Sequence, residues 1–376
     1  MNILVFTYDY PYRKYNNMSF VKQLIEQFAE MGHLCTVISP WPIFRKRGRA
    51  AVDVWENKGE GSSVRVLRPN YLTIPHLKIG AFYPSQWLRE RAIRKSLCSL
   101  KEMPDVIYCH FWNQGLIALP YAQKWHRPIF VASGESDIVS LLDMKKVTED
   151  FKHIVKGVIC ASGKNKLESV KLGLTSENKC IVLPNAIDNA KFHKIDKIAC
   201  RKQLNLPQDK FIVCFVGWFI ERKGPLRLQE ALRMINNDNI GVLYIGEGPQ
   251  QPKGDNILFK GSVKHDNLKY YLNASDVFIL PTLNEGCCNA IVEAMACGLP
   301  VVSSDMDFNR EILDASNSIL INPMNINEIA DAINRLFSDK KMTMTLSKGA
   351  LKRAAELKID RRASQIIDFI NEKIKQ

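Results

Sequence analysis

The sequence predicts an α/β fold made of two Rossmann-like domains, each a doubly wound parallel sheet. Short apolar runs alternate with amphipathic helical patterns from Ile3–Phe6 onwards, and such uniformly apolar runs are typical of buried parallel strands. The alternation starts again at Phe211–Val216, which predicts a second sheet of the same kind. At 376 residues the chain is long enough for two domains that each bury their own core.

The expected strands of the first domain are short and are separated by helical patterns. Ser19–Met31 places Phe20, Leu24 and Phe28 on one helical face and ends before Gly32. Ligands of doubly wound sheets bind at the carboxyl ends of the strands, where the strand order reverses, so we expect a site there. The runs predicted as strands are Ile3–Phe6, Cys35–Ser39, Val64–Leu67, Val106–Tyr108, Ile129–Ala132, Val158–Ala161 and Ile181–Leu183.

Composition is that of a globular protein, with 46% hydrophobic and 24% charged residues. No apolar run approaches the length of a membrane span, and the first residues read as a buried strand rather than a signal peptide. The ten cysteines show no paired spacing typical of metal ligands, and several lie in apolar runs. We therefore expect reduced thiols in a cytoplasmic protein, without a metal site.

Basic residues are concentrated near the N-terminus. The net charge is +13, and residues 1–100 contain 15 lysines and arginines against seven acidic residues. Within residues 41–102, aromatic residues such as Tyr71 and Trp87 are interleaved with arginines. Two interpretations stay open: peripheral contact with an anionic membrane at the inner face of the cell membrane, or an amphipathic helix that faces its own core. No groove-reading or RNA-binding motif accompanies the charge, which argues against nucleic acid as a partner.

The most informative stretch is residues 280–305, where a strand, a loop, a short helix and a second strand follow one another. Asn289 is the predicted N-cap of the helix, and Gly298 can end it with a left-handed backbone. The backbone amides of Cys288, Asn289 and Ala290 lie at the helix start, a position that suits an anion such as a diphosphate.

Two carboxylates accompany this helix, Glu285 in the loop and Glu293 within the helix. Their spacing, together with the run Glu293–Val302, resembles the signature of retaining glycosyltransferases of family 4, the glycosyl transferases group 1. The resemblance covers nearly the whole chain and is strongest over residues 184–323. It implies the GT-B architecture, in which two Rossmann-like domains face each other across a cleft that holds the active site.

The resemblance implies transfer of a sugar from a nucleotide-sugar donor, with retention of anomeric configuration and without a metal or cofactor. Glu285 would be the catalytic residue, which contacts the sugar and stabilises charge during transfer, and Glu293 would hold the ribose hydroxyls. Lys223 matches the family's lysine that faces the diphosphate. Trp218 stands where the family often has arginine, and Arg222 is a substitute for that contact. The other donor-binding residues that the resemblance implies are Gly217, Gly246, Gly261, Cys288, Asn289 and Ala290.

The first domain departs from the family pattern on the acceptor side. The loop after the first strand carries Asn17 near the place of the family's glycine pair, and asparagine tolerates a left-handed backbone. His110 ends a strand that resembles the family's strand before a His-containing turn. Gly134 replaces the expected histidine, so Glu135 or Asp137 would take its part. The alternative, which the sequence favours, is that Asp137 caps the following helix.

The predicted domains are residues 1–190, which would bind the acceptor, and 191–357, which would bind the nucleotide-sugar. A helix at about 358–376 is expected to pack back on the first domain. The resemblance implies a saccharide or lipid-linked acceptor and a role in cell-surface polysaccharide or glycolipid biosynthesis. Two other classes stay open: a non-catalytic nucleotide-sugar-binding subunit, and another GT-B enzyme such as a sugar epimerase or phosphorylase.

Overall fold

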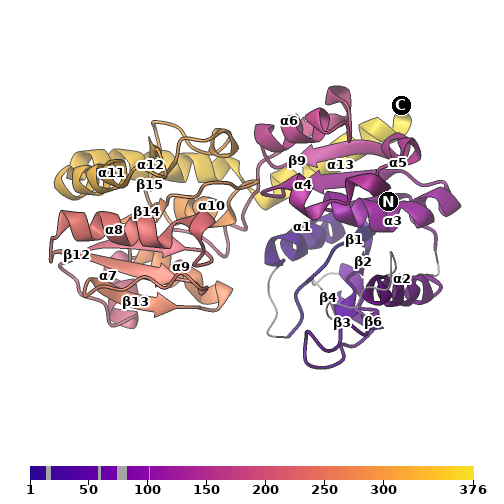
Figure 1. The fold of residues 1–376 in the computed structure, drawn as a ribbon, viewed down its shortest axis with the longest axis horizontal. Helices are drawn as coiled ribbons and strands as arrows, with labels where there is room; N and C mark the ends of the chain where they lie inside the picture. The colour runs from indigo at the N-terminus through magenta and orange to yellow at the C-terminus, as the bar shows by residue number, and fades with distance from the viewer. Residues whose placement is uncertain (14–17, 58–60, 74–82, 101) are drawn as a thin grey trace. The chain divides into compact units, whose positions relative to one another are not determined.

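The computed structural model describes residues 1–13, 18–57, 61–73, 83–100 and 102–376. These residues form two compact units, coloured along the chain in Figure 1. The long segment of unit 2 begins at Pro184, whereas the sequence interpretation began the second domain at residue 191. Unit 1 contains residues 1–161, 165–183 and 360–376, and unit 2 contains residues 162–164 and 184–359.

Unit 1 is built on an eight-stranded sheet with the strand order β10-β9-β8-β7-β1-β2-β5-β4. All its neighbours pair in parallel except β4, which runs antiparallel to β5 at the sheet edge. The central strands β7 and β8 are buried along their whole length, as expected for parallel strands covered on both faces. All seven runs predicted as strands belong to this sheet. Its strands are β1 (Asn2–Phe6), β2 (Leu34–Ile38), β4 (Asp53–Asn57), β5 (Ser63–Leu67), β7 (Val106–His110), β8 (Ile129–Ser133), β9 (Val155–Cys160) and β10 (Cys180–Val182), and a separate parallel pair is formed by β3 (Trp41–Pro42) and β6 (Asn70–Tyr71).

The C-terminal helix α13 packs in unit 1, although the long segment of unit 2 precedes it in the sequence. The centroid of its Phe369 ring lies 6.4 Å from that of the Phe130 ring, and both rings lie beside Gly157 of β9. A Cβ atom at Gly157 would lie 2.7 Å from the Phe369 ring, so glycine allows this close approach. The helices of unit 1 are α1 (Ser19–Glu30), α2 (Pro84–Leu97), α3 (Trp112–Trp125), α4 (Ile138–Leu141), α5 (Glu149–Ile154), α6 (Gly163–Lys171) and α13 (Ile359–Lys375).

Unit 2 contains a six-stranded, fully parallel sheet with the strand order β13-β12-β11-β14-β15-β16. The order reverses between β11 and β14, which makes the carboxyl ends of these two strands the expected ligand site. Its strands are β11 (Phe211–Val216), β12 (Ile240–Ile245), β13 (Ile257–Gly261), β14 (Val277–Leu280), β15 (Val301–Ser304) and β16 (Ser318–Ile321). Its helices are α7 (Lys197–Gln203), α8 (Pro225–Ile235), α9 (His265–Asn273), α10 (Asn289–Ala296), α11 (Ile326–Ser338) and α12 (Lys340–Glu356).

Helix α10 begins one residue earlier than the sequence predicted. Cys288, and not Asn289, occupies the N-cap position, because the Cys288 carbonyl already accepts the first helical hydrogen bond, from the amide of Ile291. The prediction that Asn289 caps the helix is therefore wrong, and no side chain caps this end. Gly298 has φ +81°, the left-handed conformation expected where the helix ends.

Helix α12 holds the carboxyl end of α10 in place. Ser347 Oγ donates a 2.6 Å hydrogen bond to the Gly298 carbonyl, and Leu351 packs beside Gly298. The close approach of α12 to the backbone of Ser316 depends on Gly349, because a Cβ atom there would lie only 1.9 Å from the carbonyl oxygen of Ser316. Since that neighbour is backbone, it cannot move aside as a flexible side chain would.

We predict that Gly349→Ala destabilises the protein, although alanine normally favours a helix interior by about 1 kcal/mol over glycine. The added methyl group forces α12 away from Ser316, with an expected loss of about 1–3 kcal/mol in the free energy of unfolding. Urea unfolding measures this loss, and Lys348→Ala at the neighbouring exposed position is the control. Equal or greater stability of Gly349→Ala would contradict the packing described here.

Candidate active site

Six of the predicted donor-binding residues follow the carboxyl ends of β11 and β14: Gly217, Arg222 and Lys223 after β11, and Cys288, Asn289 and Ala290 at the start of the helix after β14. The loops after these strands are tied together, since the amide of Leu283 donates to the Arg222 carbonyl at 2.7 Å. Gly224 lies at the crossing with φ +76°, and a Cβ atom there would lie 2.7 Å from the carbonyl oxygen of Pro281. The two loops can therefore meet only because position 224 is glycine.

The loop after β11 is also held from its other side, by the loop after β12. A Cβ atom at Gly246 would lie 1.9 Å from the Gly217 carbonyl oxygen, and one at Gly248 would lie 2.5 Å from the Phe219 carbonyl oxygen. Phe219 is buried, whereas its neighbour Trp218 is 61% exposed. The side chain at the place of the family's arginine is thus an exposed aromatic ring on a tightly packed loop.

Glu285 forms ion pairs with two cations of the site. Its Oε1 lies 2.5 Å from Lys223 Nζ and 2.7 Å from a terminal guanidinium nitrogen of Arg222, and it accepts a 2.8 Å hydrogen bond from Thr282 Oγ1. Arg222 also donates to the carbonyl of Asn284. The cluster of Glu285, Lys223 and Arg222 places one carboxylate and two cations beside the start of α10.

Lys223 is held in its charged form. Burial lowers the pKa of Lys223, but Cys288 and Glu285 beside it raise that pKa above its ordinary value overall. Cys288 Sγ lies 3.9 Å from Lys223 Nζ, and burial raises the pKa of the Cys288 thiol. The first amides of α10 lack intrahelical acceptors, so they and Lys223 form a site of positive potential that suits a phosphate group.

Glu293 lies within α10 and faces a histidine that the sequence analysis did not consider. Glu293 is buried to 8% exposure, and its Oε1 lies 2.8 Å from His265 Nε2 at the start of α9. Phe192 packs against the imidazole at 5.1 Å between ring centroids. Burial lowers the pKa of His265, and Glu293 raises it, with a net rise above the ordinary value. Gly261, at the end of β13, accepts a hydrogen bond from the Gly246 amide at 2.9 Å.

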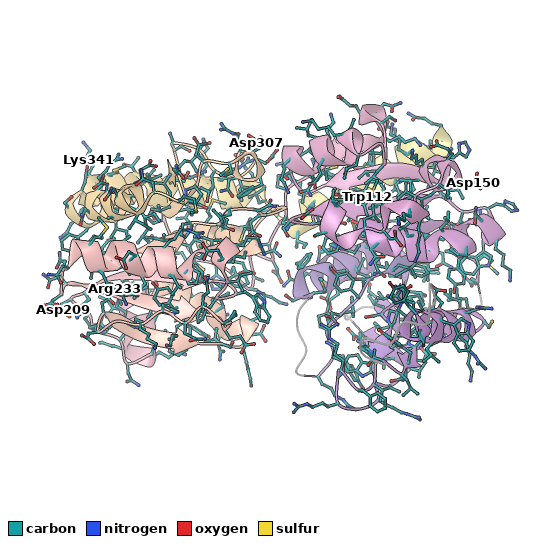
Figure 2. The ribbon with its side chains drawn as sticks, viewed as in Figure 1. Trp112, Asp150, Asp209, Arg233, Asp307 and Lys341 are labelled. Atoms are coloured by element: carbon teal, nitrogen blue, oxygen red, sulfur yellow. The ribbon has the colours of Figure 1, made fainter. Side chains whose placement is uncertain are left out.

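On the acceptor side predicted in unit 1, Glu135 binds the start of helix α3. Glu135 Oε1 accepts a 2.8 Å hydrogen bond from the amide of Trp112, which is labelled in Figure 2, and Oε2 accepts from Ser133 Oγ and the Gly134 amide. Burial raises the pKa of Glu135 to about 7, although these hydrogen bonds favour the ionised form. The carboxylate therefore takes the place at a helix start that an anionic ligand would otherwise occupy.

His110 and Asp137, two other residues predicted on the acceptor side, each have their own partners within unit 1. His110 is buried against Phe20 and Phe111, and burial together with Arg362 lowers its pKa to about 3, so it stays neutral. Asp137 accepts a hydrogen bond from the Ser140 amide and caps α4, the alternative that the sequence left open. Asn17 lies outside the described residues.

Two residues of the site were missed from the sequence, Thr282 and His265. Thr282 lies two residues after the strand that ends at Leu280, and this position was the available signal for it. His265 begins α9, four residues after the end of β13, and no local pattern pointed to it. Among the described residues, no group of three histidine, cysteine, aspartate or glutamate side chains is arranged to hold a metal ion. Nor does any helix in the described part of the chain have the length and apolar character to cross a membrane.

Residues 196–353 match the family described as glycosyl transferases group 1. The Bacillus subtilis protein TuaC, named as a teichuronic acid biosynthesis glycosyltransferase, is 27% identical over 354 residues that cover 89% of each chain. A galactosyltransferase of Escherichia coli that acts on GlcNAc-diphosphoundecaprenol with UDP-galactose, by its name, is 26% identical over 66% of this chain and 72% of its own length.

Solved structures share the fold at low sequence identity. Sucrose-phosphate synthase from Thermosynechococcus elongatus has a TM-score of 0.79 and 19% identity, and the match covers 100% of this chain and 99% of that one. HepE of Anabaena in complex with UDP-glucose has a TM-score of 0.75 and 17% identity, over 99% and 100% of the two chains. The family match over residues 196–353, the two α/β sheets and these relatives agree: the chain is similar to the glycosyl transferases group 1 family and shares the GT-B fold of retaining glycosyltransferases.

Proposed function

We propose that this glycosyltransferase moves a sugar from a nucleotide-sugar to a saccharide or lipid-linked acceptor in the biosynthesis of a cell-surface polysaccharide or glycolipid. The cluster of Glu285, Lys223 and Arg222 beside α10 is the observation that carries the proposal. It combines two cations and a helix start, which suit the diphosphate of a donor, with a carboxylate, which suits the sugar.

The proposed transfer requires charge to be stabilised at two places. The bond between the anomeric carbon and the diphosphate oxygen breaks, a bond to the acceptor oxygen forms, and the acceptor hydroxyl passes its proton to the departing diphosphate oxygen. Negative charge develops on the departing nucleoside diphosphate, where Lys223, Arg222 and the amides of α10 lower its energy. Positive charge develops on the sugar, where Glu285 is the stabilising carboxylate. Because protein groups can carry the phosphate charge, the transfer needs no metal in this proposal.

The ribose of the donor is assigned to Glu293. His265 fixes one oxygen of this carboxylate, and the buried packing of Phe192 fixes His265 in turn. The other oxygen of Glu293 remains to accept hydrogen bonds from the ribose hydroxyls. Glu293 is thus a binding residue for the nucleotide, and His265 is a residue that positions it.

The names of similar proteins guide the choice of substrates to test. The galactosyltransferase and the HepE complex both carry UDP in their descriptions, so UDP-sugars are the first donors to try. The galactosyltransferase also acts on a lipid diphosphate-linked sugar by its name, which favours a lipid-linked saccharide as the acceptor. Such an acceptor would place the enzyme in the cytoplasm at the inner face of the membrane. Glu135 and His110 would lie on the acceptor side, in unit 1.

We predict that Lys223→Ala weakens UDP binding roughly ten- to hundredfold, because a charge-assisted contact to phosphate is worth about 1.5–3 kcal/mol. Calorimetric titration with UDP measures the change, and the exposed Lys253→Ala is the matched control. The titration and the transfer assay are run in EDTA. Unchanged UDP affinity would remove Lys223 from the site, and a loss of transfer that added metal restores would refute the metal-free mechanism.

Glu285→Gln is predicted to lower the transfer rate on the order of a hundredfold or more, because the charge that faces the sugar is lost. Binding of bare UDP should be retained or become tighter, since Lys223 and Arg222 are freed from their carboxylate. Glu293→Gln should instead weaken UDP binding. Initial rates of UDP release and UDP titrations separate these effects, with the exposed Glu247→Gln as control. Loss of UDP binding in Glu285→Gln, with only the rate lost in Glu293→Gln, would reverse the assigned roles.

The pair of His265 and Glu293 predicts a pH-dependent stability. Because the pKa of His265 is raised in the folded state, the pair stabilises the protein below the unfolded pKa of about 6.5. This contribution is lost as the pH rises through the folded pKa. The difference in melting temperature between wild type and His265→Gln should therefore be larger at acidic than at alkaline pH. A difference that is constant with pH would show that the pair contributes packing alone.

A further inference from the structure

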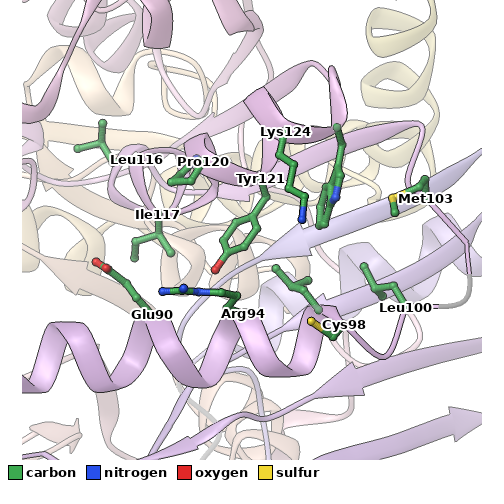
Figure 3. Close-up of a pocket in the computed structure, with 12 residues that line it drawn as sticks. Glu90, Arg94, Cys98, Leu100, Met103, Leu116, Ile117, Pro120, Tyr121 and Lys124 are labelled. Carbon is green, nitrogen blue, oxygen red and sulfur yellow. The ribbon is translucent and has the colours of Figure 1, made fainter.

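A pocket with an apolar floor lies between helices α2 and α3 of unit 1 (Figure 3). Its volume of about 460 Å³ is in the range of roughly 300–1,000 Å³ that is typical of small-molecule sites. The floor is made of side chains that pack on the core of the unit. Among them are Leu97, Leu116, Ile117, Tyr121 and Trp125.

This pocket is separate from the predicted acceptor region. Helix α3 begins at Trp112, directly after the carboxyl end of β7, and the pocket is lined by its later residues up to Trp125. At 1.5 Å per residue, a helix that runs from 112 to 124 extends about 18 Å. Leu100 and Met103, which also line the pocket, precede the first residue of β7. The pocket thus lies toward the amino ends of the strands, away from the edge where ligands of such sheets react.

Two cations line the pocket. Figure 3 shows Arg94 of α2 and Lys124 of α3 reaching into the space beside Tyr121. Neither forms an ion pair within the described part of the chain. Glu90 is the carboxylate among the lining residues, and α2 as a whole carries four basic residues against this one acid. The pocket therefore favours a ligand that has an apolar part and a negative charge.

We propose that this pocket binds the acyl chain of an anionic phospholipid of the membrane, with the lipid phosphate held by Arg94 and Lys124. A free phosphate or nucleotide would leave the apolar floor exposed to water, whereas an acyl chain covers it. The lipid is a membrane contact and not the sugar acceptor, because the pocket lies away from the reacting edge of the sheet.

Exposed residues at and near the start of α2 favour a membrane as the source of this lipid. Tyr83 and Trp87 are each 44% exposed, and such aromatic rings are enriched at membrane–water interfaces. The guanidinium carbon of Arg91 lies 5.4 Å from the centroid of the Trp87 ring, so a positive charge lies beside this ring. Aromatic rings and basic side chains on one helix are the combination that binds anionic membrane surfaces. This inference rests on the pocket and does not depend on the proposed transfer reaction.

Cys98 provides a direct test, because it lines the pocket and is exposed, whereas the other nine cysteines are buried or part-buried. We expect phosphatidylcholine vesicles that contain phosphatidylglycerol to slow maleimide labelling of Cys98 about tenfold or more. Pure phosphatidylcholine vesicles and inorganic phosphate should leave the labelling rate unchanged. Binding to the anionic vesicles without protection of Cys98 would overturn the proposal, because the chain would then not enter the pocket.

A matched pair of double variants separates the pocket from general surface charge. Arg94→Gln with Lys124→Gln removes the two lining cations, and Arg91→Gln with Lys95→Gln removes two cations of the same helix that do not line the pocket. We expect the first pair to lose about tenfold more affinity for the anionic vesicles than the second, because its phosphate contacts are direct. Equal losses would show that surface charge alone binds the membrane.

Filling the pocket provides a test in which the net charge is unchanged. Ile117→Trp should abolish the vesicle protection of Cys98, and Leu116→Phe is a milder substitution in case the larger ring prevents folding. Circular dichroism shows whether each variant is folded. None of these residues belongs to unit 2, so the melting-temperature shift that UDP causes should be unchanged. If vesicles still protect Cys98 in a folded variant whose pocket is filled, the acyl chain does not bind in this pocket. If protection is intact but UDP no longer shifts the melting temperature, the result counts against the proposed donor site instead.

Discussion

The ion cluster around Glu285 is the interaction on which the predicted donor site depends. The Lys223 side chain is only 12% exposed, and an ammonium group in such a place without a counter-charge would cost several kcal/mol. Glu285 supplies that charge and at the same time orients Arg222. A donor diphosphate brings its own negative charge to the same cations. Under the proposed function, a bound donor would partly free this carboxylate to contact the sugar.

The cluster needs loops that approach one another more closely than side chains allow. Gly224 lets the loop after β11 cross the backbone of Pro281, and Gly246 and Gly248 let the loop after β12 lie against it. Each of these contacts would be broken by a single methyl group. These close backbone contacts fix the path of a short segment in which Lys223 contacts Glu285 while Trp218 stays exposed.

The two units use a helix start in opposite ways. In unit 2, helix α10 begins without a side-chain cap, and Lys223 lies nearby, so its amides are available to an anion. In unit 1, the corresponding position at α3 is filled by Glu135, which accepts hydrogen bonds from Trp112 and Gly134. An internal carboxylate therefore replaces a ligand there. This difference in charge fits an anionic donor on one unit and hydroxyl groups as the ligand of the other.

The sequence by itself predicted seven strands of the first sheet, the strand β11 and the helix α1, and it put forward Glu285, Lys223 and Glu293 as residues of one donor site. These follow from local patterns, because apolar runs, turn glycines and motif spacing are properties of neighbouring residues. Only the tertiary structure decided which groups touch. Glu285 meets Lys223 from 62 positions away along the chain, Glu293 meets His265, and Glu135 turns to the start of α3. Such partners depend on the order of strands in the sheet, and on the side-chain directions that packing selects, neither of which a local pattern of residues contains.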